Sequence, residues 1–135
     1  SAGKATRQNI NEYITNTQRA IGQLSGIKNN KVIINLNPSN PPVNMMNSIF
    51  FECKRFNKEK LKRARLVLNK INKTIKKYIP GYNAKLFYQK NENFFRVTIR
   101  VVGSGDYLST FAGNLDIITS SSAYIGKLLN EKYNY

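Results

Sequence analysis

The sequence predicts an α+β fold, with helices packed on one face of a mixed or antiparallel sheet. Three features of the 135-residue chain lead to this class. Apolar residues recur at helical spacing in separate segments, one segment alternates apolar and polar side chains, and glycine- and proline-rich breaks separate them. The chain is long enough to form a core and shows no linker or internal repeat, so we expect a single domain over residues 1–135.

A first helix is predicted over residues 6–24, because its apolar side chains fall at three- and four-residue steps. Thr6 or Asn9 is expected to cap it, and Asn9 with Glu12 has the spacing of a capping box. Gly26 ends it, since glycine readily adopts the left-handed conformation that follows many helices. The helix face comprises Ile10, Tyr13, Ile14, Thr17, Ile21 and Leu24.

Two strands are expected next. Residues 32–36 have the composition of a short buried strand, and residues 37–42 break regular structure because Pro38, Pro41 and Pro42 remove backbone donors. Residues 48–53 return to strand composition. Cys53 is the only thiol, and the chain contains no histidine to activate it, so we interpret it as a small apolar residue.

A second helix is predicted over residues 57–78, and Pro80-Gly81 ends it. Its core stripe consists of Leu61, Ala64, Leu68, Ile71, Ile75 and Tyr78. Its other faces are basic. They carry Lys58, Lys60, Lys62, Arg63, Arg65, Lys70, Lys73, Lys76 and Lys77.

The remaining segments predict an antiparallel hairpin and a last helix. Residues 84–90 form one strand, residues 91–93 a turn and residues 94–102 the other strand. In the second strand Phe95, Val97, Ile99 and Val101 alternate with Arg96, Thr98 and Arg100. The last helix is expected to start near Ala112 or Asn114 and to run to Leu129.

The charge is far from balanced: 22 Lys and Arg residues against 7 Asp and Glu give +15. This excess favours anionic partners such as RNA or an anionic assembly, although an AT-rich genome would also enrich lysine. Aromatic residues near the hairpin are interpreted as core and turn residues rather than a stacking platform. They are Tyr82, Phe87, Tyr88, Phe94 and Phe95.

Other classes of site find little support. A single cysteine and no histidine leave no metal site of the Cys/His type, and no apolar run is long enough for a membrane span. Asp106 and Asp116 form a possible carboxylate pair. We favour structural roles instead, Asp106 in the glycine-rich turn and Asp116 in the first turn of the last helix.

Several motifs, in order, resemble the acylating acetaldehyde dehydrogenases, and specifically their C-terminal dimerisation and substrate domain. The longest are Gly103-Ser104-Gly105-Asp106-Tyr107-Leu108 and Ala112-Gly113-Asn114-Leu115-Asp116-Ile117. The others are the opening Ser-Ala-Gly segment with Thr6, Arg7 and Asn9, the Asn37-Pro38 loop with Pro41-Pro42, and Tyr78-Ile79-Pro80-Gly81-Tyr82. Lys4, Ala5 and Gln8 depart from the family's opening segment. The resemblance implies a fold similar to the C-terminal domain of glyceraldehyde-3-phosphate dehydrogenase-like enzymes.

The resemblance also implies roles for individual residues. Ile34 stands where an aliphatic residue lines the aldehyde site in the family. Asn47 stands where the family has an aspartate that assists the catalytic thiol, and an amide cannot replace a carboxylate as a base. NAD contacts are implied for Ser1, Ala2, Gly3, Thr6, Arg7, Asn9 and Asn114.

Enzymes of this family convert acetaldehyde, NAD and coenzyme A into acetyl-CoA and NADH through a cysteine nucleophile. Both that cysteine and the Rossmann half are expected N-terminal to this chain, so no catalytic residue is expected here. The chain alone should be inactive and should bind neither cofactor tightly. A homodimer, a 4-hydroxy-2-oxovalerate aldolase partner and a cytoplasmic location are implied.

Two alternatives stay open. In the first, the chain is a non-catalytic relic recruited as a basic structural or RNA-binding component of an organellar assembly, such as a mitochondrial ribosome in the matrix. The net charge of +15 and Asn47 motivate this reading. In the second, it is a regulatory domain that binds NAD without turnover.

Overall fold

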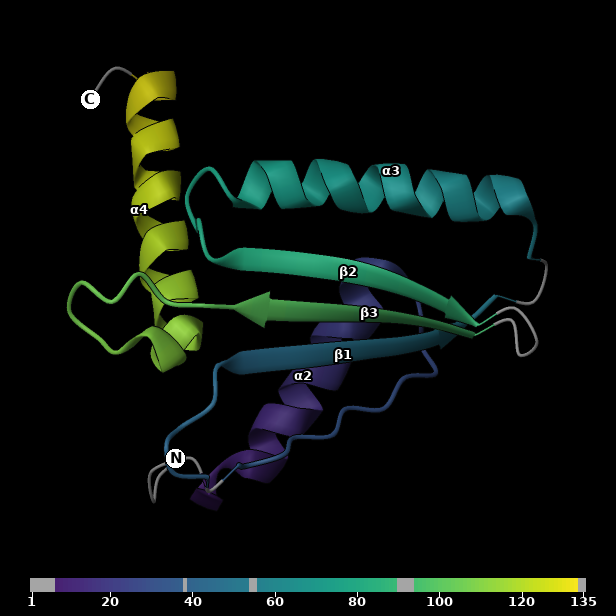
Figure 1. Cartoon of the computed structure of the whole chain (residues 1–135), viewed down its shortest axis with the longest axis horizontal. Helices are drawn as coiled ribbons and strands as arrows, with labels where there is room; N and C mark the ends of the chain where they lie inside the picture. The colour runs from purple at the N-terminus through teal and green to yellow at the C-terminus, as the bar shows by residue number, and fades with distance from the viewer. Residues whose placement is uncertain (1–6, 38, 54–55, 90–93, 134–135) are drawn as a thin grey trace. The chain divides into compact units, whose positions relative to one another are not determined.

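The computed structural model describes residues 7–37, 39–53, 56–89 and 94–133 (Figure 1). The chain divides into two compact units, Ser1–Val43 and Asn44–Tyr135. We describe each unit by itself, and the expectation of a single domain stays a prediction. The α+β class is confirmed: the described residues form three α-helices and a three-stranded antiparallel sheet.

The first unit contains the helix α2 (Ile10–Ser25). Gly26 ends it as expected, with φ of 73° and its N–H donating to the carbonyl of Gly22 at 3.0 Å. Asn9 occupies the N-cap position, but its side chain makes no capping hydrogen bond, so the expected capping box does not form. Asn30 holds the chain that follows against the helix, because its amide donates to the carbonyl of Gln18 at 3.3 Å.

The strand predicted over residues 32–36 is wrong. This segment is irregular, and Ile33 is 71% exposed. A strand needs a neighbour to accept and donate its ladder hydrogen bonds, and the described part of the first unit contains no other strand. Local β-propensity was therefore insufficient to predict structure here.

The second unit contains the sheet, in the order β1-β3-β2. Strand β1 (Met45–Glu52) starts earlier than predicted and ends one residue before Cys53, which is half-buried. Strands β2 (Tyr82–Gln89) and β3 (Phe94–Val101) pair antiparallel, which confirms the hairpin strands. The turn predicted at residues 91–93 lies outside the described residues.

Helix α3 (Lys58–Ile75) packs on β2. Asn57 caps it by accepting a hydrogen bond from the backbone N–H of Lys60 at 2.8 Å. The helix ends at Ile75, before the predicted Tyr78, and a turn leads to Gly81. Helix α4 (Gly113–Tyr133) follows a short 3₁₀ turn, η2 (Thr110–Ala112), and runs beyond the predicted Leu129.

The core of the second unit lies between the sheet and these helices. Its buried members are Ile79, Tyr82, Ala84 and Val101. Burial raises the pKa of the Tyr82 hydroxyl, and the neighbouring Tyr78 adds to the shift. Half-buried residues complete the cluster: Met45, Leu68, Ile75, Tyr78, Val97, Ile99 and Ile117.

One polar side chain joins α3 to the sheet. The amide of Asn72 donates to the carbonyl of Ala84 at 2.8 Å and accepts from the N–H of Ala84 at 2.9 Å. These bonds satisfy both backbone groups at the edge of β2. Asn72 and not the predicted Ile71 lies on the packed stripe, because Asn72 is half-buried and Ile71 is 39% exposed.

We therefore expect Asn72→Ala to lower the free energy of unfolding by about 1–3 kcal/mol, since it removes two hydrogen bonds and leaves the groups of Ala84 without partners. Urea unfolding measures the change. Asn69→Ala is the matched control, because Asn69 is exposed on the same helix and its loss should change little. Equal effects for the two variants would contradict a specific bond to Ala84.

Candidate functional site

The end of β3 is where the elements of the second unit converge (Figure 1). Val101 pairs with Met45 of β1 and with Tyr82 of β2, and it is fully buried. A Cβ added to Gly113, the first residue of α4, would lie 2.6 Å from the carbonyl oxygen of Val101. Glycine is therefore required here to let the helix approach the strand.

A glycine-rich loop joins β3 to α4. The N–H of Gly103 donates to the carbonyl of Thr110 at 2.7 Å, which closes the loop at its base. Asp116 in the first turn of α4 accepts a hydrogen bond from the N–H of Ser104 at 2.7 Å. The carboxylate of Asp116 thus joins helix and loop, while Asp106 is exposed. This contact supports the structural role expected for Asp116.

Two of the predicted site residues come to the same end of the sheet. Asn114 is the exposed second residue of α4, directly after Gly113. Asn47 lies two residues after Met45 in β1, on the same face of the sheet as Met45. Met45 pairs with Val101, and Gly113 lies against the carbonyl of Val101. Asn47 and Asn114 therefore belong to elements that meet at the end of β3.

The other predicted cofactor and substrate residues belong to the first unit. Arg7 and Asn9 are exposed at the start of the first helix, and Ile34 is half-buried in the irregular segment after it. Asn9 makes no side-chain capping bond. The predictions for Ser1, Ala2, Gly3 and Thr6 lie outside the described residues.

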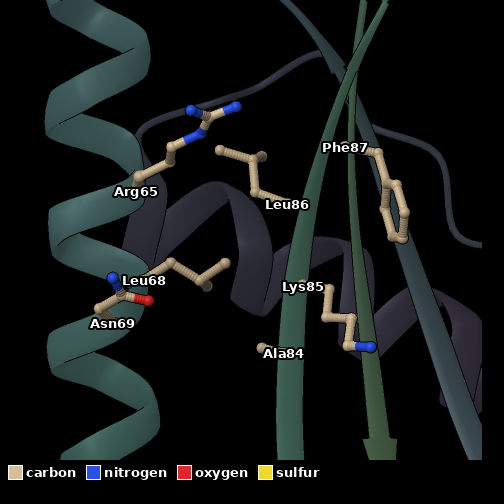
Figure 2. A pocket seen from close by; sticks show the side chains of 7 residues that line it. All are labelled: Arg65, Leu68, Asn69, Ala84, Lys85, Leu86 and Phe87. Atoms are coloured by element: carbon tan, nitrogen blue, oxygen red, sulfur yellow. The ribbon is translucent and has the colours of Figure 1, made fainter.

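A pocket of about 340 Å³ lies between α3 and β2 (Figure 2). Arg65, Leu68 and Asn69 line it from the helix, while Leu86 extends toward them from the strand. Lys85 and Phe87 extend away to the other side of β2. The described lining combines the charged side chains of Arg65 and Lys85 with an apolar floor and contains no carboxylate.

The predicted basic residues are all exposed, on α3 and in the turn after it. The aromatic interpretation was wrong in part. Tyr82 and Phe95 are buried as expected, but Phe87 is 45% exposed. Alternation along the strands places Phe87 and Phe94 on the face opposite the core.

Other kinds of site receive no support from the described residues. In that part of the chain no group of three His, Cys, Asp or Glu side chains could hold a metal ion. None of the described helices is long and apolar enough to cross a membrane.

Comparison with known proteins identifies relatives. A family model described as "Prokaryotic acetaldehyde dehydrogenase, dimerisation" matches residues 1–109. The acetaldehyde dehydrogenase of Pectobacterium atrosepticum is 36% identical over 130 residues, which are 96% of this chain and 43% of the relative. That of Spirochaeta aurantia is 41% identical over 122 residues, covering 90% of this chain and 40% of the relative. That of Bacillus cereus is 36% identical over 127 residues, covering 94% and 42%. The chain therefore spans about 40% of the length of these curated relatives.

The contact at Gly113 can be tested with a pair of variants in one helix. We expect Gly113→Ala to destabilise the protein by about 1–3 kcal/mol, because the new methyl group would overlap Val101. Gly126→Ala should instead stabilise it by about 0.5–1 kcal/mol, since a Cβ there meets nothing within 4 Å and alanine favours the helix. Thermal unfolding compares the two. A neutral Gly113→Ala would show that α4 does not approach β3 this closely.

Proposed function

The chain belongs to the prokaryotic acetaldehyde dehydrogenase family, and we propose that it is the dimerisation and substrate domain of an enzyme that oxidises acetaldehyde with NAD and coenzyme A to acetyl-CoA. The observation that carries the proposal is the exposed Asn114, which stands two residues before the Asp116 that joins α4 to the glycine-rich loop. Asn114 and Asn47 both lie where the family resemblance implies site residues.

The described residues fit part of a nicotinamide nucleotide. An asparagine side chain offers both a donor and an acceptor, which match the carboxamide of a nicotinamide ring. The close contact of Gly113 with Val101 fixes the backbone on which Asn114 stands. In the first unit, taken by itself, Arg7 and the amide of Asn9 offer donors suited to phosphate oxygens. NAD bound there would supply the acceptor for the hydride that is released as the aldehyde is oxidised.

The roles proposed for this chain are binding and orientation. NAD contacts are proposed for Arg7 and Asn9, and likewise for Ser1, Ala2, Gly3 and Thr6. Ile34 is proposed to line the aldehyde site, where an apolar side chain excludes water. The nucleophilic cysteine and the Rossmann half are proposed to come from the part of the enzyme that corresponds to the rest of the relatives' length, so the chain alone is proposed to be inactive.

A homodimer and a cytoplasmic location are also proposed, with a 4-hydroxy-2-oxovalerate aldolase as the supplier of acetaldehyde. The family model concerns dimerisation, which supports the homodimer. The relatives named above are bacterial proteins called acetaldehyde dehydrogenases. This favours an enzyme domain over a non-catalytic component of a mitochondrial assembly.

The proposal predicts NAD- and coenzyme A-dependent oxidation of acetaldehyde by the full protein that contains this chain. In that protein, Asn114→Ala should raise the KM for NAD about tenfold, because one hydrogen-bonded contact is lost. Steady-state kinetics measure the change. Asn130→Ala, an exposed position in the same helix, is the control and should leave KM unchanged. Absence of acetaldehyde oxidation in the unmodified protein would contradict the proposed reaction.

Asn47 provides a second prediction. If it stands in place of the assisting aspartate, Asn47→Asp restores a carboxylate beside the reacting thiol and should raise kcat about tenfold or more. Measuring kcat against pH should also show a new ionisation in the variant. An unchanged kcat and pH profile would mean that position 47 does not act on the thiol.

A further inference from the structure

The outer edge of β2 is open beyond Ala84. Strand β2 pairs with β3 on one side only, so it is the last strand of the sheet on its other side. The backbone groups of Ala84 point to that outer side, where Asn72 binds both of them. Successive residues of an antiparallel strand direct these groups to opposite sides, so Leu86 and Tyr88 also direct theirs outward. In the described part of the chain, the outward groups of Leu86 and Tyr88 have no hydrogen-bond partner.

The pocket between α3 and β2 lies along this open edge (Figure 2). Its lining includes Ala84 and Leu86 of the strand and Arg65 and Leu68 of the helix. Leu68 and Leu86 form an apolar floor, and Arg65 extends from the helix toward Leu86. With a volume of about 340 Å³, the pocket has room for an apolar side chain from another molecule.

A row of cations on α3 borders the same edge. Arg65 and Asn69 line the pocket, and residues three or four positions apart share one side of a helix. Glu59 is the only acid of the helix and lies outside this row. Among the described residues, no cation of the row forms a salt bridge. We call it the cationic row, and its exposed members are Lys58, Lys62, Arg65, Asn69 and Lys73.

From these features we propose that the open edge of β2 binds an extended acidic peptide segment of a partner protein. The segment adds a strand to the sheet, and its backbone bonds to the outward groups of Leu86 and Tyr88. One of its apolar side chains enters the pocket, and the carboxylates two positions before and after it meet the cationic row. The pocket lining contains no carboxylate that would repel them.

The spacing of strand and helix suits this contact. Side chains two positions apart in a strand are separated by about 7 Å, and those three or four positions apart on a helix by about 5–6 Å. Alternate carboxylates of the added strand therefore reach successive cations of the row. The charges are complementary, because the row holds four cations and no acid.

Two other occupants fit less well. A nucleic acid duplex would use the cationic row, but it would leave the apolar floor and the outward backbone groups of Leu86 without partners. A second copy that paired with β2 edge to edge across a two-fold axis would bring each cationic row toward that of its copy. Like charges would then repel each other. An acidic strand with an apolar side chain uses all three features.

The proposal is tested with the full protein that contains this chain, by fluorescence anisotropy of a labelled peptide. The probe is Thr-Glu-Thr-Leu-Thr-Glu-Thr, in which the leucine and both glutamates share one side of an extended chain. A control peptide with lysine in place of both glutamates should bind at least about tenfold more weakly, because it loses its charge-assisted hydrogen bonds. Equal affinity for the two peptides would overturn the proposal.

Backbone pairing is tested with N-methylated peptides. One version carries methyl groups on the amide nitrogens of the threonines, and the other on those of the leucine and the glutamates. Only one version should lose binding, because alternate residues of a strand direct their N–H groups to a given neighbour. Loss of binding in both versions, or in neither, would contradict an added strand.

Two arginines of α3 separate a specific contact from general attraction. Arg65→Gln should weaken binding of the glutamate peptide about tenfold, because Arg65 lines the pocket. Arg63→Gln removes the same charge from an exposed position on the same helix. Because two residues turn a helix by about 200°, Arg63 faces away from the edge, and its loss should leave the affinity nearly unchanged.

Amide hydrogen exchange identifies the bound strand edge. With the glutamate peptide at ten times its dissociation constant, the amides of Leu86 and Tyr88 should exchange about tenfold more slowly. The amides of Lys85 and Phe87 already face β3, so their exchange should change little.

Two further outcomes would overturn the proposal. If Arg63→Gln and Arg65→Gln weakened the peptide equally and a DNA duplex bound more tightly than the peptide, binding would be diffuse attraction to a basic protein. If Arg65→Gln changed the oligomeric state in light scattering but not the affinity for the peptide, the edge would be a contact between copies. None of these measurements involves acetaldehyde or NAD, so the result is independent of the proposed reaction.

Discussion

The second unit depends on the close approach of backbones at the end of β3. Val101 lies opposite Met45 of β1 and Tyr82 of β2 in the register of the sheet, and its carbonyl lies against Gly113 of α4. One residue later, the N–H of Val102 donates to the carbonyl of Gly81 at 3.1 Å. Side chains larger than hydrogen would overlap the strand at both glycines. The turn after α3 and the start of α4 are thus held at one point, and the core forms around it.

This constraint separates the residues of the family resemblance into two groups. Gly81, Gly113 and Asp116 are explained by the fold, since they permit close packing or join α4 to the loop. Asn114 and Tyr107 are not explained in this way, because both are exposed and Tyr107 is wholly so. The presence of the family motifs by itself therefore supports the fold. The functional argument depends on the residues that the fold does not require.

The sequence predicted those elements whose signal is local. Helix α2 with its glycine end, the asparagine cap of α3 and the alternation in β3 all follow from spacing within one segment. The strand at residues 32–36 failed because pairing depends on a partner elsewhere in the chain. The packing role of Asn72 was also missed. Asn72 follows Leu68 by four residues, so it falls on the apolar stripe of the helix, and a polar residue at that position was a signal of a buried hydrogen bond.

The candidate site shows the same division. The sequence identified Asn47 and Asn114 through the resemblance, but only the pairing of Met45 with Val101 and the contact of Gly113 show that they share one end of the sheet. That Arg96 lies between Phe50 and Phe87 could not be predicted, because each hairpin strand taken alone leaves its register against β1 open. Alternation separates the faces of a strand, whereas register decides which side chains meet across strands.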